Sequence, residues 1–423
     1  MVTFRAPAGP FRAVLRPPGD KSLSHRALIL AAMAPGESVV SGLGPGADVA
    51  STRRAVVSLG VVCDDDRIAS PGIAGWIPPS APIDAGNAGT TMRLLAGALA
   101  GTAFTTTLVG DRSLMQRPMA RVAGPLRDLG AAVTLDQSGR PPLVVEGRPL
   151  RGTAIDLPVA SAQVRTAVAL AALQAEGATT IDSPPGYRDH TERWLAALGR
   201  GEMLGETCFR VLPGPVPVFD LKIPGDLSSA AFLLAAAALR PGASVTVTGV
   251  TLNPGRTGFL DVLATMGAVV TRPGTGTVLG DPVGDVTVVG APLHGTHVSG
   301  ELTGRAIDEL PLVALLGSVA AGTTIVGDAA ELRVKESDRI ETTVAMVRAL
   351  GGRARATEDG FEIDGVATLA GGPVATAGDH RVAMTAAVAA TAATAPIAVT
   401  GYEAAAVSWP RFEETLEAVW SSQ

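Results

Sequence analysis

A helix that ends in glycine recurs along the chain at nearly constant spacing, and a Val- or Thr-rich strand is expected after most of these endings. The endings lie at Gly60, Gly130, Gly199, Gly267 and Gly351, which are 70, 69, 68 and 84 residues apart. A glycine in the left-handed conformation lets the chain leave a helix toward a strand without a clash of Cβ. The spacing therefore predicts about six units of about 70 residues in a chain of 423 residues.

A longer match divides these units into two halves. PGDKSLSHRALILAAMAPGESV at 18–39 corresponds to PGDLSSAAFLLAAAALRPGASV at 224–245. Each unit is expected to contain a helix, a glycine turn, a strand, a second helix and two more strands. We therefore predict an α/β protein with two three-unit domains. One domain comprises 20–224 and the other 1–19 plus 225–423, with an active site in the cleft between them.

Composition excludes several classes of protein. The chain has a net charge of −6 and only 4% aromatic residues, so neither a phosphate-tracking groove nor a stacking platform for nucleic acid is expected. The N-terminal stretch has no apolar secretory segment, and no apolar run is long enough to span a bilayer, which predicts a cytoplasmic protein without membrane partners. Its two cysteines have no CxxC spacing, and no metal site is expected.

Basic side chains are predicted at helix N-termini, where the helix dipole disfavours them. Bare N–H groups and cations together form a site for phosphate or carboxylate. The alternative for any single residue is a solvated surface charge. The residues in question are Lys21, Arg26, Arg93, Arg165, Lys335, Arg339 and Arg381.

Acidic residues interrupt this basic set. Asp308 and Asp48 each have the alternative interpretation of an N-cap. Glu336, beside Lys335 and close to Arg339, would stay ionised and would be suited to proton transfer if partly desolvated.

A capping box is the preferred interpretation of Asp189 and Glu192. His25 and His380 precede helix arginines and are expected to orient those arginines or to pack in the core.

No P-loop and no strand-linked G-x-G-x-x-G is present, so nucleotide-dependent phosphoryl or hydride transfer lacks its phosphate cradle. The residues alone indicate a metal-free, two-domain enzyme that gathers small anions and moves protons.

Several motifs, in order along nearly the whole chain, resemble the signatures of the 5-enolpyruvylshikimate-3-phosphate (EPSP) synthase family. They are GDKSLSHR (19–26), NAGTTMR (87–93), QRPM (116–119), SAQ (161–163), RVKESDR (333–339) and GDHR (378–381). The resemblance implies an inside-out α/β barrel of six βαβαββ repeats, three in each domain. It also implies transfer of the enolpyruvyl group of phosphoenolpyruvate to the 5-hydroxyl of shikimate 3-phosphate, without metal or cofactor. The two substrates would be its small-molecule partners, and the protein would act as a monomer.

Site residues follow from the resemblance by position. It implies that Asp308 is the base for the 5-hydroxyl, that Glu336 is the acid that protonates the methylene carbon, and that Lys21 assists proton movement. Shikimate 3-phosphate would be held by Lys21, Ser22, Arg26, Ser161, Ala162, Gln163, Asp308 and Lys335. Phosphoenolpyruvate would be held by Lys21, Gly89, Arg117, Gln163, Arg339 and Arg381.

Three departures from the family pattern matter. Val407 stands where many members carry a lysine, and Ala162 stands where enteric-type sequences have a second serine. The RDHTE stretch at 188–192 is similar to the class II subgroup, which makes Arg188 a candidate phosphate ligand. Class II members commonly carry alanine at the position of Gly89, which bears on inhibition by glyphosate, a competitor of phosphoenolpyruvate in this family.

Two alternatives remain open. UDP-N-acetylglucosamine enolpyruvyl transferase has a reactive cysteine in its mobile loop, and the corresponding loop at 111–118 has none. An anion-binding module without catalysis would not need Asp308 and Glu336 among its cations.

Overall fold

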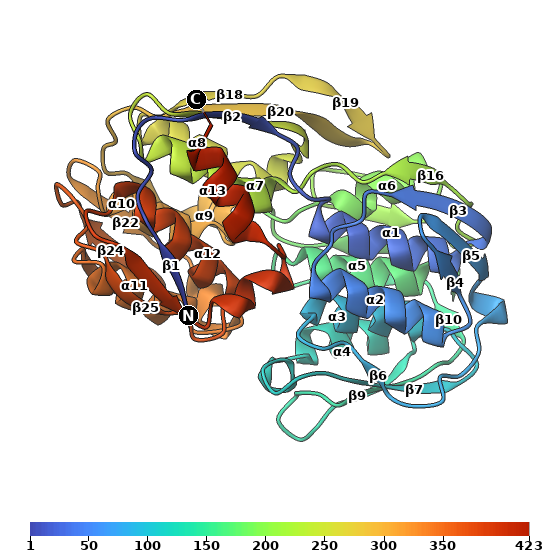
Figure 1. Cartoon of the computed structure of the whole chain (residues 1–423). Coiled ribbons are helices and arrows are strands. Elements are labelled where there is room, and N and C mark those ends of the chain that lie inside the picture. Colours follow the sequence, from blue (N-terminus) through green and yellow to red (C-terminus); the bar gives the residue numbers. More distant parts are fainter. Residues whose placement is uncertain (423) are drawn as a thin grey trace. The chain divides into compact units, whose positions relative to one another are not determined.

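The computed structural model describes residues 1–422 and divides them into two units, each with its own hydrophobic core. Unit 1 comprises Met1–Pro18, Gly225–Gly276 and Pro282–Gln423, and unit 2 comprises Gly19–Pro224 and Thr277–Asp281. Figure 1 shows unit 2 in blue to green, and unit 1 in yellow to red with the N-terminal strands in dark blue.

Unit 2 contains six α-helices and most of the first sixteen strands. The helices are α1 (Lys21–Met33), α2 (Ala47–Ser58), α3 (Gly89–Leu99), α4 (Ala120–Asp128), α5 (Ala162–Ala172) and α6 (His190–Ala197). The strands are β3 (Pro35–Ser41), β4 (Val62–Asp64), β5 (Arg67–Pro71), β6 (Ile83–Asp84), β7 (Thr105–Val109), β8 (Ala132–Thr134), β9 (Leu143–Glu146), β10 (Leu150–Arg151), β11 (Ala154–Asp156), β12 (Ala175–Glu176), β13 (Thr179–Asp182), β14 (Gly201–Met203), β15 (Phe209–Val211) and β16 (Asp220–Lys222).

Unit 1 contains the remaining elements. Its helices are α7 (Leu227–Ala238), α8 (Gly258–Thr265), α9 (Gly300–Ala306), α10 (Leu310–Gly317), α11 (Arg339–Ala349), α12 (His380–Ala389) and α13 (Phe412–Trp420). Its strands are β1 (Val2–Phe4), β2 (Arg12–Leu15), β17 (Ser244–Thr251), β18 (Val269–Thr271), β20 (Asp281–Val289), β21 (His297–Val298), β22 (Thr323–Val326), β23 (Arg353–Ala356), β24 (Phe361–Asp364), β25 (Gly372–Ala375) and β26 (Ile397–Thr400). Two of the crossings between the units fall within strands: one lies in β19 (Gly274–Val278), and the other follows Asp281, the first residue of β20.

One pairing pattern is common to the larger sheets. A strand pairs in parallel with the central strand, and the central strand pairs antiparallel with the next. The sheets of unit 2 have the orders β16-β3-β5-β4, β6-β7-β9-β8 and β11-β13-β15-β14, beside the short pair β10-β12. Those of unit 1 are β2-β17-β20-β18, β21-β22-β24-β23 and β25-β26-β1. One α-helix lies in the connection between β6 and β7, between β11 and β13, and between β25 and β26, as parallel pairing requires. The parallel pairs β16-β3 and β2-β17 instead join strands that are far apart in the sequence.

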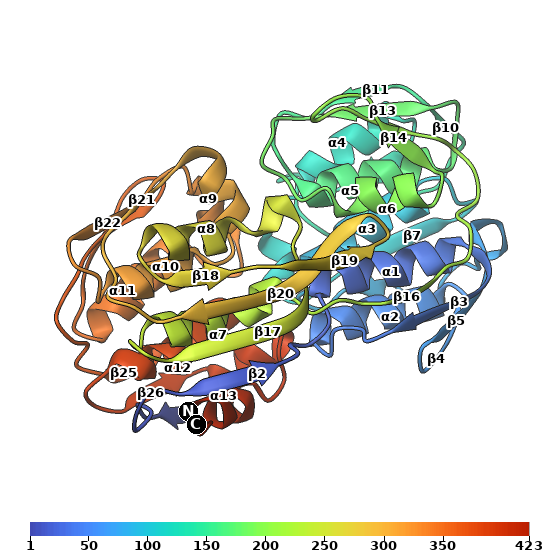
Figure 2. The same cartoon turned by 90° about the horizontal axis from the view of Figure 1, so that it is seen from above.

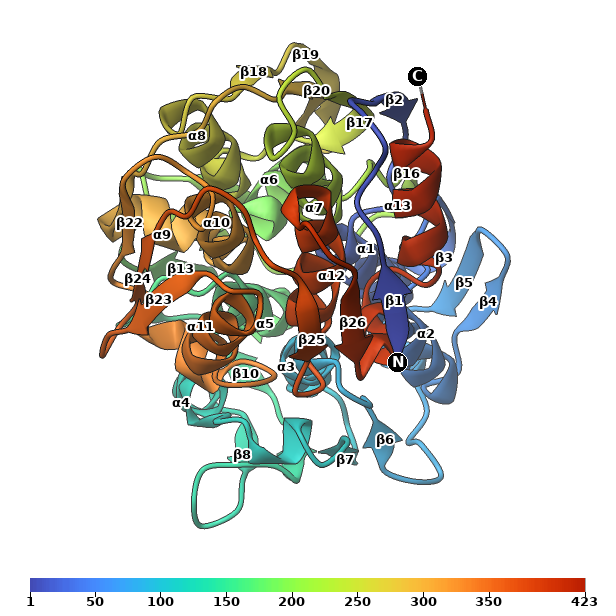
Figure 3. The same cartoon turned by 60° about the vertical axis from the view of Figure 1, so that its left-hand side comes forward.

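The Ala- and Leu-rich helices occupy the interior of each unit. Helices apolar on all sides are stable only when they are surrounded by protein, and all twelve residues of α7 are buried. In unit 2, α3 contacts both α1 and α5, which Figure 2 shows beside one another. In unit 1, α7, α10 and α12 contact one another (Figure 3). The first two turns of α1, α3, α5 and α12 carry basic residues singled out by the sequence, whereas α7 and α10 contain none.

The predicted glycine endings are confirmed. Gly60, Gly130, Gly199, Gly267 and Gly351 all have positive φ, between 68° and 104°. Each directly follows the C-cap residue of a helix, where the left-handed conformation reverses the chain.

The unit boundaries differ from the predicted domains in two details. Gly19 belongs to unit 2, and so do residues 277–281, which were expected in the other domain. Leu279 packs against the core of unit 2, and the Asp281 carboxylate contacts His190 there. Because His190 and Asp281 are 91 residues apart in the sequence, the spacing of the repeats could not predict their contact.

No helix among residues 1–422 is both long and apolar enough to cross a bilayer.

The close packing of α3 on α5 depends on Gly97. A Cβ at this position would lie 2.0 Å from the backbone oxygen of Ala167. We expect Gly97→Ala to lower the free energy of unfolding by about 1–3 kcal/mol or more, because two buried helices would have to separate. Gly205→Ala is the matched control, since a Cβ there meets nothing within 4 Å, and its effect should stay within about 0.5 kcal/mol. Urea unfolding of both variants tests this, and equal stabilities would refute it.

Candidate active site

Lys21 begins the first buried helix of unit 2. Asp20 is the N-cap residue of α1, and its Oδ1 accepts a hydrogen bond from Leu23 N at 2.9 Å. Lys21 Nζ donates to Asp48 Oδ2 at 3.1 Å, and both side chains are largely shielded. Asp48 lies in the first turn of α2 and does not cap it, so the N-cap interpretation is wrong. The pair holds an ammonium group at a helix N-terminus, where the dipole alone would repel it.

Arg26 is buried one turn further along α1. Its Nε and Nη2 donate to Thr191 Oγ1 and Thr166 Oγ1, each at 2.8 Å, and its Nη1 donates to the carbonyl of Ser22 at 3.0 Å. The pKa of Arg26 is lowered to about 10, chiefly because the guanidinium is buried. These three neutral acceptors fix its orientation without neutralising its charge.

Two arginines converge on Gly89, the first residue of α3. A Cβ at Gly89 would lie 2.8 Å from Arg93 Nη1 and 3.3 Å from Arg117 Nη1. Arg93 Nη1 also donates to Gln163 Oε1 at 2.7 Å, and Arg117 Nη2 donates to Asn87 Oδ1 at 2.7 Å. The absence of a side chain at Gly89 leaves both guanidinium groups beside a bare helix N-terminus, which is a favourable place for an anion.

The other residues predicted for this half lie on nearby elements. Ser161 is the N-cap residue of α5, Ala162 is its first residue, and Gln163 follows, with its Nε2 donating to Thr90 Oγ1 at 2.9 Å. Arg188 precedes α6 and is close enough to Arg26 for its charge to lower the pKa of Arg26. We call Lys21, Arg26, Arg93, Arg117, Gln163 and Arg188 the unit 2 cluster.

The capping-box interpretation of Asp189 and Glu192 is wrong. Asp189 is the N-cap residue of α6, but its side chain makes no capping bond and instead accepts from Arg193 Nε at 2.8 Å. Glu192 accepts from Arg165 Nε at 2.6 Å, and both are buried. The Arg165 guanidinium also lies 4.0 Å from the centre of the Tyr187 ring. Arg165 is therefore a structural cation, and not one that faces a ligand.

In unit 1, Asp308 lies between two cations. Its Oδ1 is 3.8 Å from Lys335 Nζ and 3.6 Å from Arg339 Nη1. An anionic group between Lys335 and Arg339 relieves their mutual repulsion. The N-cap interpretation of Asp308 is wrong, because α10 begins at Leu310 and its N-cap residue is Glu309. Lys335 was expected at a helix N-terminus, but it precedes the Asp338 cap of α11.

Arg339 is the most heavily paired of these cations. It forms an ion pair with Glu336, and its Nε donates to Asp379 Oδ2 at 2.8 Å. Although burial opposes the charged form, the carboxylates of Asp379, Glu336 and Asp308 raise the pKa of Arg339. Glu336 therefore faces a permanent cation, and its side chain is 18% exposed, which leaves it accessible to a ligand.

Glu309 was missed by the sequence analysis. It is 2% exposed, it accepts from Arg381 Nη1 at 3.1 Å, and it forms a hydrogen bond with Ser228. Arg381 follows the first residue of α12, so Glu309 holds a cation at another buried N-terminus. No periodicity or motif distinguishes Glu309 from an ordinary residue at a helix start. We call Asp308, Lys335, Glu336, Arg339 and Arg381 the unit 1 cluster.

A chain of hydroxyl groups links three helices of unit 2 through His25. His25 Nδ1 lies 2.6 Å from Thr52 Oγ1, which lies 2.6 Å from Thr91 Oγ1. Burial, followed by the charges of Lys21 and Arg26, lowers the pKa of His25 well below its usual value. His25 therefore packs as a neutral ring between cations and is unsuited to be their partner.

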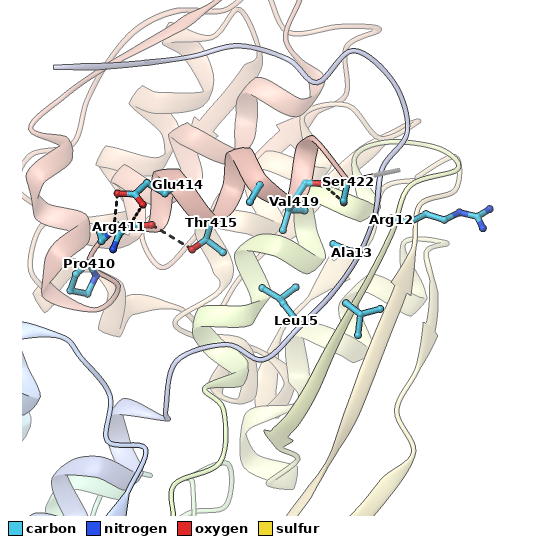
Figure 4. Close-up of a pocket in the computed structure, with 11 residues that line it drawn as sticks. Arg12, Ala13, Leu15, Pro410, Arg411, Glu414, Thr415, Val419 and Ser422 are labelled. Atoms are coloured by element: carbon cyan, nitrogen blue, oxygen red, sulfur yellow. Dashed lines mark hydrogen bonds and ion pairs between the residues drawn. The ribbon is translucent and has the colours of Figure 1, made fainter. Parts of the chain in front are cut away.

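No metal centre is found in the part of the chain that the structure describes. Residues 1–422 contain no group of three or more His, Cys, Asp or Glu placed to hold a metal ion. An open groove of about 660 Å³ lies elsewhere in unit 1, between β2 and α13 (Figure 4). Its lining includes the exposed ion pair of Arg411 with Glu414 and none of the unit 1 cluster. We therefore assign no substrate to this groove.

The two clusters offer complementary chemistry. Cations at helix N-termini can bind phosphate and carboxylate groups. Partly shielded carboxylates such as Asp308 and Glu336, each beside a cation, can accept or deliver a proton.

Comparison with solved structures defines the class of protein. The chain superposes on EPSP synthase from Acinetobacter baumannii with a TM-score of 0.86 and 36% identity, covering 99% of this chain and 97% of that one. It also superposes on the enolpyruvyl transferase NikO from Streptomyces tendae with a TM-score of 0.78 over 99% and 96% of the two chains. At 18% identity the second likeness shows the fold alone. The fold is that of the enolpyruvyl transferases.

The chain belongs to the EPSP synthase family. Residues 6–416 match the family model of EPSP synthase (3-phosphoshikimate 1-carboxyvinyltransferase). The chain is 44% identical to a 3-phosphoshikimate 1-carboxyvinyltransferase from Bacillus velezensis, with 95% of each chain covered. It is 45% identical to one from Roseiflexus castenholzii, with 96% and 97% covered. The expected resemblance is thus confirmed.

The buried, neutral His25 predicts a pH dependence of stability. In the unfolded chain His25 takes up a proton below about pH 6.5, whereas in the folded chain its lowered pKa keeps it neutral. The unfolded state then binds more protons, so the free energy of unfolding falls as pH decreases from about 6.5, by at most about 1.4 kcal/mol per pH unit from this group. His25→Asn should make this fall shallower.

Urea unfolding at about pH 7, 6 and 5 measures the effect. His297→Asn is the control, because His297 is exposed and its replacement should leave the slope unchanged. An unaltered slope in His25→Asn would show that this ring does not govern the dependence.

Proposed function

We infer that this chain is a 3-phosphoshikimate 1-carboxyvinyltransferase. It transfers the enolpyruvyl group of phosphoenolpyruvate to the 5-hydroxyl of shikimate 3-phosphate and releases phosphate, a step of aromatic amino acid biosynthesis. The observation that carries this inference is the match of residues 6–416 to the EPSP synthase family model. The alternative, UDP-N-acetylglucosamine enolpyruvyl transferase, is not favoured, because the relatives compared above are named for the first activity.

In this proposal the unit 2 cluster binds anions. Arg26, with Ser22, Ser161, Ala162, Gln163 and Arg188, takes part in holding shikimate 3-phosphate, whereas Arg117 and the backbone at Gly89 receive phosphoenolpyruvate. Neutral partners support these roles: Arg26 donates to Thr191 and Thr166, and Arg117 donates to Asn87. Such partners hold a guanidinium in place while its charge stays available to a phosphate.

Also in this proposal, the unit 1 cluster moves protons. Asp308 accepts the proton of the 5-hydroxyl as its oxygen attacks C2 of phosphoenolpyruvate, and Glu336 delivers a proton to the methylene carbon. The tetrahedral intermediate then loses phosphate and a methyl proton, which restores the carbon–carbon double bond and leaves the product as an enol ether. Lys335, Arg339 and Arg381 stabilise the negative charges of both substrates, and Lys21 assists proton movement. Residues of both units therefore serve one reaction, without metal or cofactor.

We also propose that the enzyme acts as a monomer in the cytoplasm, on these two small molecules and on neither nucleic acid nor membranes. The net charge of −6 and the low aromatic content support the exclusion of nucleic acid.

Removing either carboxyl should slow the reaction without unfolding the protein. The wild type should turn over shikimate 3-phosphate with phosphoenolpyruvate and should not use UDP-N-acetylglucosamine. Asp308→Asn and Glu336→Gln should each lower kcat by about 10²-fold or more, because an amide cannot exchange the proton. Steady-state release of phosphate measures this.

Glu341→Gln provides the control, because Glu341 is an exposed carboxylate on α11 at 60% side-chain exposure. Its kcat should equal that of the wild type. Full turnover in Asp308→Asn or Glu336→Gln would remove that residue from the mechanism, and inactivity of the wild type would refute the function.

Gly89 should determine how the site distinguishes phosphoenolpyruvate from glyphosate. A methyl group there would displace the ends of Arg93 and Arg117 and narrow the space beside them. We expect Gly89→Ala to weaken glyphosate more than phosphoenolpyruvate, since the longer ligand suffers more and misfit costs about 1–3 kcal/mol. Parallel determination of Ki and KM for both forms tests this, and an equal loss for both ligands would contradict it.

A further inference from the structure

Five residues from the second half of the chain, 277–281, belong to unit 2, although the chain on either side of them belongs to unit 1. Leu279 packs against the core of unit 2, and Arg193 Nη1 donates to the Gly280 carbonyl at 3.3 Å. Both apolar and polar contacts therefore attach this segment to unit 2.

Asp281 ends this segment in a buried contact. Both of its carboxylate oxygens lie 3.0 Å from Nδ1 of His190, and neither side chain is exposed to solvent. Desolvating such a pair is costly, and removing one partner usually costs more than the pair contributes. A carboxylate at this place also complements the positive end of α6, because His190 is the first residue of that helix.

The residue after His190 contacts the unit 2 cluster. Thr191 Oγ1 accepts from Arg26 Nε at 2.8 Å and lies 2.6 Å from Thr166 Oγ1, which accepts from Arg26 Nη2. The position of α6 therefore sets the position of one of the acceptors that orient Arg26. Asp281 acts on the same helix one residue earlier.

Asp281 also acts on Arg26 through its charge. Burial lowers the pKa of Arg26, and the carboxylates of Glu192, Asp20 and Asp281 oppose that lowering. The charge of Asp281 thus favours the charged form of Arg26, and its contact with His190 favours the orientation of Arg26.

We propose that Asp281 is a positioning residue for phosphate recognition. Through His190 it fixes the start of α6, so that Thr191 holds Arg26 ready for the phosphate of shikimate 3-phosphate. The proposal rests on the function inferred above for the unit 2 cluster. It assigns a role in substrate binding to a segment that comes from the other half of the chain.

Asp281→Asn tests this with little change of shape. The amide should hold His190 less firmly, so the KM for shikimate 3-phosphate should rise about tenfold. The KM for phosphoenolpyruvate at saturating shikimate 3-phosphate, and kcat, should stay within about twofold. Arg117, which receives phosphoenolpyruvate in the proposal, is held by Asn87 and not by α6, and the unit 1 cluster is untouched. Asp281→Glu, which keeps the charge, should recover part of the loss.

Asp285→Asn is the matched control. Asp285 lies four residues further along the same strand, and its Oδ1 accepts from Gly249 N at 2.8 Å in unit 1. Its KM values should equal those of the wild type. A lowered stability of Asp281→Asn with an unchanged KM for shikimate 3-phosphate would overturn the proposal, since a purely structural pair predicts that result.

Hydrogen exchange of the wild type provides a second measurement that needs no variant. Because coupling between two sites is reciprocal, shikimate 3-phosphate should slow exchange of the amides at 190–193 and at 277–281. Absence of protection at 277–281 would contradict the proposal even if Asp281→Asn failed to fold. Wild-type turnover tests the function itself, whereas the ratio of variant to wild type tests the role of Asp281.

Discussion

Cations at the N-termini of buried helices are the constraint on which the rest of this structure depends. A helix dipole repels them, and burial removes the water that would otherwise stabilise them. Each one therefore requires partners that the fold must deliver: Asp48 for Lys21, Thr191 for Arg26, and Glu309 for Arg381. Within each unit, the Ala-rich helices pack on one another because they have no polar face, and this packing brings the N-termini of that unit together.

The partners of Arg26 and Arg93 in the unit 2 cluster differ from those of Arg339 and Arg381 in the unit 1 cluster, although Lys21 of unit 2 also has a carboxylate partner. Arg339 and Arg381 face carboxylates, with which they form ion pairs. Arg26 instead donates to hydroxyl and carbonyl oxygens, and Arg93 donates to the amide oxygen of Gln163. Neutral acceptors orient a guanidinium and leave its charge to a ligand, whereas carboxylates are both counter-ions and proton carriers. This difference supports the proposal that the unit 2 cluster binds anions and that the unit 1 cluster moves protons.

Local features of the fold could be predicted from the sequence, because their causes are local. A glycine that ends a helix, such as Gly130, shows its role through its neighbours, and Arg93 or Arg381 is placed at a helix N-terminus by the residues around it. The partners could not be predicted in this way. Glu192 has the spacing of a capping box, but burial of Arg165 gives it a stronger partner.

Long-range contacts explain why the remaining part of the site escapes sequence analysis. Arg26 and Thr191 are 165 residues apart, and His190 and Asp281 are 91 apart. The entropic cost of closing such long loops is only slightly larger than that of shorter ones, so the fold can form these contacts. They leave no local pattern in the sequence, however, because the two partners are far apart along the chain.

The same separation has a physical consequence for the site. The orientation of Arg26 needs Thr166 on α5 and Thr191 on α6, and α6 in turn contacts Asp281 from beyond residue 276. The acceptors of Arg26 can therefore come together only after distant parts of the chain have folded. By contrast, Glu336 and Arg339 are three residues apart and can pair within one short segment. The orientation of Arg26 thus depends on global folding, whereas part of the unit 1 cluster depends on local structure.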